Sequence, residues 1–184
     1  MSGGEANEPK LVELFSAREV EARITALADE LARALAGRVP LFVVIAEGAR
    51  RFADALAARF AARGLGADRL VVRARRTRGL ELLPVEVDAL PLAQLAGRDV
   101  VVVDDIADEG RTLEAVCARV RAGAPHSLRT MVLISKLSRR RVAIPLDFVG
   151  FEVARGWVVG FGMDLDGRLR DLDWIGVVAG SESD

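Results

Sequence analysis

The first apolar residues of the chain recur with helical spacing. Ser16-Ala-Arg-Glu19 has the form of a capping box, in which each end residue accepts a hydrogen bond from the other's backbone N–H at a helix start. The apolar positions that follow stop at Gly37, and they are Val20, Ile24, Leu27, Leu31 and Leu35. This pattern predicts an amphipathic helix between the capping box and Gly37.

Strand and helix patterns then alternate. The apolar run Val39–Ala46 predicts a buried strand, Glu47-Gly48 a turn, and the next segment a helix with an apolar face of Phe52, Leu56 and Phe60. Further strands are predicted at Leu70–Val72, Val100–Val103 and Met131–Ile134, with a helix over Arg111–Arg121. Because buried strands alternate with helices, we expect an α/β fold whose mostly parallel sheet is covered on both faces.

The end of the chain has a different pattern. Short strands are predicted there without a long helix between them, at Phe148–Val153, Trp157–Phe161 and Trp174–Val178. They suggest a small appended lobe, or hood. The 184 residues are expected to form a single domain, 1–184, with frayed tails at Met1 to about Lys10 and at Gly180–Asp184.

Composition narrows the classes of function. The 27 acidic and 26 basic residues nearly balance, so we expect no nucleic-acid partner unless the arginines at 73–78 act locally. Cys117 is the only cysteine, which excludes an internal disulfide and fits a reducing compartment, and His126 has the setting of a solvated turn residue. Because no secretory h-region and no run of 18 apolar residues occurs, we expect a cytoplasmic protein without a membrane partner.

The stretch VVVVDDIADEGRTL, Val100–Leu113, holds the candidate chemistry. Ligands of α/β sheets bind where strand ends meet helix N-termini, and backbone N–H groups near Gly110 are suited to cradle a phosphate. Asp104 and Asp105, at the expected strand end, are suited to ribose hydroxyls or to Mg²⁺. Alternatively, these acids only favour the helix dipole, with Asp108 as a plain N-cap.

The pattern Asp104-Asp-x-x-Asp-x-Gly-x-Thr112 resembles the phosphoribosyl pyrophosphate (PRPP) signature of the type I phosphoribosyltransferases. Asp147–Val153, Val158–Asp164 and Arg170–Leu172 resemble the tail of the hypoxanthine-guanine members, and the likeness covers most of residues 14–178. It implies the type I phosphoribosyltransferase fold, with a hood from N-terminal residues and about 147–178. It also implies purine salvage: phosphoribosyl transfer from PRPP to hypoxanthine or guanine, giving IMP or GMP and pyrophosphate, with Mg²⁺.

The resemblance assigns roles by position. Asp108 is implied as the base that takes the purine N7 proton, and Lys136 as the donor to the 6-oxo group. The implied PRPP-binding residues are Asp104, Asp105, Ala107, Asp108, Glu109, Gly110, Arg111 and Thr112. The implied purine-binding residues are Lys136, Trp157, Val158 and Asp164; those for pyrophosphate are Ala46, Glu47, Gly48, Arg140 and Arg170; those for the metal are Asp104, Asp105 and Asp164. Alternatively, Lys136 is solvated and Trp157 belongs to the core of the hood.

Three positions depart from the family pattern. Ala46-Glu47 stands where Lys-Gly is usual, the lid region Arg75–Gly79 lacks the usual Ser-Tyr, and Glu109 stands where a small hydroxyl residue is usual. A carboxylate about 4 Å from a phosphate charge, at an effective dielectric of about 20, is repelled by roughly 4 kcal/mol. We therefore expect the Glu109 side chain to turn outward to solvent. The arginines at 50, 51, 76 and 78 either replace lost pyrophosphate contacts or form a solvated basic face.

Three functions are consistent with these residues. The first is an active 6-oxopurine transferase whose partners are small-molecule substrates. The second is a weakly active or non-catalytic relative that binds PRPP or a nucleotide as a regulator, and the third is an RNA-binding regulator that uses the arginines at 73–78. A homodimer or homotetramer is expected from the resemblance, whereas the preference among hypoxanthine, guanine and xanthine is left open.

Overall fold

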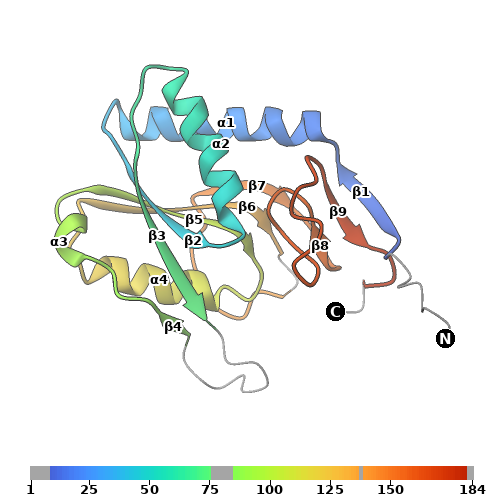
Figure 1. The fold of residues 1–184 in the computed structure, drawn as a ribbon. Coiled ribbons are helices and arrows are strands. Elements are labelled where there is room, and N and C mark those ends of the chain that lie inside the picture. Colours follow the sequence, from blue (N-terminus) through green and yellow to red (C-terminus); the bar gives the residue numbers. More distant parts are fainter. Residues whose placement is uncertain (1–8, 76–84, 137–138, 182–184) are drawn as a thin grey trace, which may run out of the picture.

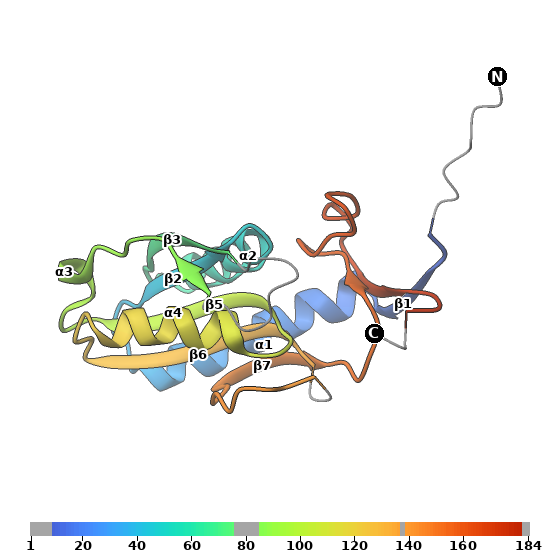
Figure 2. The same ribbon diagram turned by 90° about the horizontal axis from the view of Figure 1, so that it is seen from below.

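A six-stranded sheet, in the order β4-β3-β2-β5-β6-β7, forms the centre of the molecule (Figures 1 and 2). The computed structural model describes residues 9–75, 85–136 and 139–181. The strands of this sheet are β2 (Leu41–Ala46), β3 (Asp68–Arg75), β4 (Glu86–Val87), β5 (Asp99–Ala107), β6 (Ser127–Ser135) and β7 (Phe148–Glu152). All neighbouring pairs are parallel except β3 and β4, which confirms the predicted mostly parallel sheet.

Helices cover both faces of this sheet. α1 (Ala17–Leu35) and α2 (Ala49–Ala61) pack on one face, and α4 (Arg111–Arg121) packs on the other together with the short α3 (Leu92–Leu95) (Figure 1). Successive residues of β2 alternate between the two cores: Phe42 and Val44 face α1 and α2, and Val43 and Ile45 face α4. Because both faces are buried, each central strand reads as a continuous apolar run.

The predicted helices are confirmed. α1 begins at a capping box in which the Ser16 N–H donates to Glu19 Oε2 at 2.8 Å and the Glu19 N–H donates to Ser16 Oγ at 3.4 Å. α4 spans the predicted residues. Cys117 is buried in α4, and this burial raises the pKa of its thiol to about 12. The strands β3, β5 and β6 extend beyond their predicted apolar segments, because ladder hydrogen bonds rather than apolar side chains determine where a strand ends.

The hood is a separate three-stranded sheet in the order β1-β9-β8, at the right of Figure 1. It is built from β1 (Leu11–Phe15), β8 (Val158–Val159) and β9 (Ile175–Val178), so a strand near the N-terminus pairs with two strands from the end of the chain. The prediction that Phe148–Val153 belongs to the hood is wrong, because β7 pairs in parallel with β6 at the edge of the main sheet. Arg23 of α1 satisfies this edge by donating to the carbonyls of Val149 (2.6 Å) and Gly150 (2.9 Å).

Parts of three predictions lie outside the described residues. They are the lid residues Arg76–Gly79 and most of the two expected tails, at residues 1–8 and 182–184. Of the helices that the structure describes, none has the length and apolar character needed to cross a membrane.

Candidate active site

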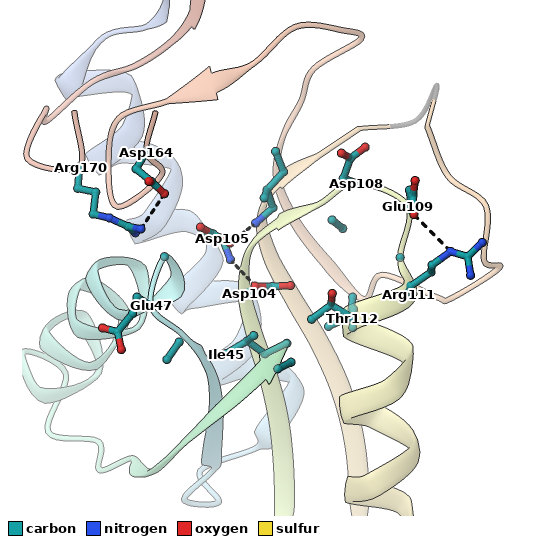
Figure 3. A pocket seen from close by; sticks show the side chains of 17 residues that line it. Ile45, Glu47, Asp104, Asp105, Asp108, Glu109, Arg111, Thr112, Asp164 and Arg170 are labelled. Carbon is teal, nitrogen blue, oxygen red and sulfur yellow. Dashed lines mark hydrogen bonds and ion pairs between the residues drawn. The ribbon is translucent and has the colours of Figure 1, made fainter. Parts of the chain in front are cut away.

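The candidate site lies where the sheet changes its direction of winding. β2 pairs with β3 on one side and with β5 on the other, so the loops that leave their carboxyl ends diverge and open a crevice. Ala46 at the end of β2, Glu47 and Gly48 after it, and the residues from Asp104 to Leu113 line a cavity of 350 Å³ there, to which the hood adds Asp164 and Arg170 (Figure 3). The Ala46–Glu47 peptide bond in this wall is cis.

Two adjacent carboxylates lie within β5 instead of after it. The predicted strand ended at Val103, but β5 continues to Ala107 because its ladder with β6 continues through Asp104 and Ile106. Asp104 is 6% exposed, and burial, reinforced by the Asp105 charge, raises its pKa well above the usual range. Burial also raises the pKa of Asp105, although hydrogen bonds from Asp104 and from the Ile106 N–H, and the Arg170 charge, oppose this rise. Burial therefore raises the pKa of both carboxyls of this adjacent pair.

Gly48 makes room for this pair. A Cβ at position 48 would lie 1.6 Å from Asp105 Oδ2. The Asp105 carboxylate thus rests directly on the backbone at the start of α2, where only glycine leaves space.

The N-terminus of α4 forms the opposite wall. Its N-cap is Gly110, with φ of +85° and no side-chain cap, so the alternative that Asp108 is the N-cap is wrong. The first-turn N–H groups of α4 have no partner within the helix, and Arg111 and Thr112 of this turn line the cavity. Glycine is required at 110 because of its positive φ and because a Cβ would lie 3.1 Å from Arg140 Cδ and 3.2 Å from the Val142 carbonyl oxygen. This geometry is that of an anion cradle.

The Glu109 side chain does not have the orientation that we expected from the sequence. Its side chain is 8% exposed and does not turn outward to solvent. Its carboxylate forms ion pairs with Arg111 Nε (3.3 Å) and Arg141 Nε (3.7 Å), and the pair with Arg111 is visible in Figure 3. A buried carboxylate requires such partners, and the arginine at 141 lies too far along the chain for a local pattern to reveal the pairing.

A second cavity, of 220 Å³, adjoins the first. The two cavities share Asp105, Ile106, Asp108 and Asp164, and Lys136, Arg139, Trp157 and Val158 are among the further residues that line the second. Lys136 is 5% exposed, so the alternative of a solvated lysine is wrong. Trp157 is 48% exposed and its indole N–H donates to the Asp164 carbonyl (2.8 Å), so it is not a core residue of the hood.

Asp108 has a partner that the motif did not indicate. Arg139 Nε lies 3.3 Å from its Oδ1, which places a guanidinium at the boundary of the two cavities. Arg140, in contrast, lines neither of these two cavities; it packs behind Gly110 and donates to Ser135 Oγ at 3.1 Å. The structure therefore does not bring Arg140 together with the other predicted pyrophosphate residues.

Arg51 of α2 holds the hood residues of the site in place, a role that the sequence pattern did not indicate. Arg170 Nη2 lies 2.7 Å from Asp164 Oδ1, and Asp164 Oδ2 also accepts from the Gly167 N–H at 2.7 Å. Arg51 of α2 donates to the carbonyls of Arg170 (3.0 Å) and Leu172 (2.9 Å) and pairs with Asp173. The Arg51 guanidinium also lies 4.6 Å from the Phe161 ring centroid. Arg51 thus anchors the hood loop to the helix that follows β2.

Known proteins are similar to this chain over most of its length. The model of the family called phosphoribosyl transferase domain matches residues 11–166. The bifunctional protein TilS/HprT of Listeria innocua is 33% identical over 165 residues, which are 90% of this chain and 25% of that protein. The hypoxanthine phosphoribosyltransferase of Escherichia coli is 42% identical over 84 residues, 46% of this chain and 47% of that protein. The chain thus spans about a quarter of the first relative and about half of the second.

Solved structures share the fold. A ternary substrates complex of the hypoxanthine phosphoribosyltransferase from Trypanosoma cruzi has a TM-score of 0.86 at 23% identity and covers 96% of this chain and 98% of that one. A hypoxanthine-guanine phosphoribosyltransferase from Bacillus anthracis has a TM-score of 0.82 at 24% identity, with 93% and 99% covered. The fold is therefore that of the type I phosphoribosyltransferases.

The raised pKa of Asp104 predicts a pH-dependent gain in stability for Asp104→Asn. The folded chain binds this proton more tightly than the unfolded chain, so native stability falls as pH rises above about 4, the pKa of an unperturbed Asp. Removing the charge should raise the free energy of unfolding at pH 7 by about 0.5–2 kcal/mol, and the gain should vanish near pH 4. Urea unfolding without divalent cations measures it.

Asp99→Asn is the matched control. Asp99 begins the same strand and is also 6% exposed, but it pairs with Arg38 at 2.9 Å, so this variant should lose stability at pH 7. Equal losses in both variants, or a gain for Asp104→Asn that does not change with pH, would contradict the proposed cause.

Proposed function

The chain belongs to the phosphoribosyl transferase family, and we propose that it catalyses purine salvage, the transfer of a phosphoribosyl group from PRPP to hypoxanthine or guanine. One observation carries this proposal: the anion cradle and the cavity lined by Lys136 and Trp157 adjoin, and Asp105 and Asp108 line both. A ribose that spans the boundary would present its 5′-phosphate to α4 and its C1 carbon to the second cavity. The products are IMP or GMP and pyrophosphate.

The described residues have different roles in the proposed transfer, according to where they lie in the two cavities. The backbone of Gly110 and the first turn of α4 hold the 5′-phosphate, and Asp104 and Asp105 accept hydrogen bonds from the ribose hydroxyls. As purine N9 bonds to C1 and the bond from C1 to pyrophosphate breaks, Asp108 takes the proton from purine N7. Arg170 and the backbone of Ala46–Gly48 hold the departing pyrophosphate, and fixing both reactants in one orientation supplies much of the rate.

The second cavity selects the base by hydrogen bonding. An ammonium only donates, so buried Lys136 accepts a partner with a 6-oxo group and disfavours the 6-amino group of adenine. The exposed face of Trp157 stacks on the purine, and the Val158 backbone reads its edge.

Mg²⁺ fits the oxygen donors of the crevice. Asp104 is buried with Asp105 beside it, burial raises the pKa of both carboxyls, and Asp164 lines the same cavity. Within residues 9–75, 85–136 and 139–181, no three His, Cys, Asp or Glu side chains are arranged to hold a metal alone. One or two carboxylates with substrate oxygens and water are the usual magnesium environment. When bound, Mg²⁺ would shield the charge of the leaving pyrophosphate.

A second candidate is a weakly active or non-catalytic relative that binds PRPP or a nucleotide. Glu47 and Glu109 favour it, because both add negative charge where anionic groups are expected to bind. A nucleotide-formation assay with PRPP, Mg²⁺ and hypoxanthine, guanine or xanthine separates the two. Turnover with a 6-oxopurine supports the transferase, whereas tight binding of GMP or PRPP without turnover supports the regulator.

Asp108→Asn tests the proposed base. It keeps the size of the side chain but cannot take the N7 proton, so kcat should fall by about 10²–10⁴. The affinity for GMP, measured by calorimetry, should stay within a few-fold. Unchanged turnover in this variant would remove Asp108 from the role of base.

Lys136→Ala tests the base pocket. Because the ammonium contacts only the purine, the variant should bind IMP and GMP more weakly while its affinity for PRPP changes little. Removing a hydrogen bond from a charged donor corresponds to about 1.5–3 kcal/mol, or roughly 10- to 150-fold in affinity. Equal losses for PRPP and for both nucleotides would contradict the assignment.

A further inference from the structure

We propose that Arg141 is a positioning residue of the 5′-phosphate cradle and that it acts through Glu109, whose carboxylate it neutralises. The inference rests on the proposed function, since it takes the cavity beside α4 as a phosphate site. It assigns a role to a residue outside the family signature, and it explains how a cradle with an acid at position 109 still binds an anion.

The contacts join residues from two distant segments. The Glu109 side chain is 8% exposed, and its two carboxylate oxygens face Arg111 Nε at 3.3 Å and Arg141 Nε at 3.7 Å. The backbone agrees with this pairing, because the N–H groups of Arg141 and Val142 both donate to the Glu109 carbonyl at 3.1 Å. The segment at 141–142 is therefore fixed against the cradle by its main chain, and the side chain of Arg141 is directed to the acid.

The charges of Glu109, Arg111 and Arg141 determine whether the cradle attracts or repels a phosphate. A buried carboxylate in the wall of an anion site repels the anion strongly, because little water screens it. With two guanidiniums beside it, the group of three carries a net positive charge and attracts a phosphate. If Arg141 is removed, Glu109 loses this ion pair, and the charge of Arg111 is then offset by the acid instead of attracting the ligand.

Arg111 and Arg141 differ in one respect that makes the proposal testable. Arg111 lines the 350 Å³ cavity and can meet a ligand directly, whereas Arg141 lines neither that cavity nor the 220 Å³ cavity beside it. We therefore expect the effect of Arg141 on a bound phosphate to depend on Glu109. Without the acid, the same arginine should matter little.

A double-mutant cycle measures this dependence. Calorimetric titrations use ribose 5-phosphate as the phosphate probe and guanosine as the probe without phosphate, on the wild type, Arg141→Met, Glu109→Gln and the double variant. We expect Arg141→Met to weaken ribose 5-phosphate binding about tenfold and Glu109→Gln to strengthen it several-fold. Adding Arg141→Met to Glu109→Gln should change the affinity less than about twofold. Guanosine binding should be the same in all four proteins.

Two further variants serve as controls. Arg141→Lys keeps the positive charge and should restore ribose 5-phosphate binding to within about twofold of the wild type. Arg119→Met removes an exposed arginine of α4 and with it the same net charge, and it should leave binding unchanged.

Other results would contradict either the inference or the proposed function, and the two cases can be told apart. An equal loss from Arg141→Met with and without Glu109 would overturn the proposal, and so would a parallel loss of guanosine binding, which indicates a structural role. If the wild type binds ribose 5-phosphate but forms no nucleotide from PRPP, the proposed function fails and the inference stands on the cycle. If the wild type binds no ribose 5-phosphate, the inference is overturned.

Discussion

The placement of Asp104 and Asp105 next to each other within β5 is the constraint on which the rest of the site depends. Ladders with β2 and β6 hold this strand at the centre of the sheet, so the two carboxylates stay adjacent in the wall of the cavity. The neighbouring elements supply groups that attract negative charge. These groups are the N-terminus of α4, buried Lys136 and the hood residue Arg170. A sheet this acidic at its centre is less stable than an apolar one, which is the exchange expected at a binding site.

The departures from the family pattern are compensated in pairs. Glu47 lies near Arg50 (3.0 Å) and Arg73 (3.6 Å), and Glu109 lies near Arg111 (3.3 Å) and Arg141 (3.7 Å). The pairs at Glu47 are exposed and contribute little energy, whereas those at Glu109 are buried on the side of the acid and matter more. Compensation at both positions favours a site that still binds an anion.

The hood depends on a different contact. Its loop carries Asp164 and Arg170, and Arg51 connects that loop to α2 through two carbonyls, Asp173 and the face of Phe161. A Cβ at Gly162 would lie 2.3 Å from the Gly48 carbonyl oxygen, so the loop also touches the start of α2. The wall after β2 and the hood wall are therefore connected as one unit. Arg51, for which the sequence suggested only a pyrophosphate contact or a solvated charge, is a structural anchor.

The sequence by itself determined what depends on neighbours a few residues apart. The capping box of α1, the apolar faces of α1 and α2, the bounds of α4 and the glycine at 110 are all local, because helical periodicity and allowed backbone angles involve only nearby residues. Only the tertiary structure decided that β7 joins the main sheet, that Trp157 is exposed, and that Glu109 is buried between Arg111 and Arg141. An apolar pattern shows which side of an element is buried but not which element covers it. A charged residue in a loop is likewise exposed or paired according to contacts with segments distant in the chain.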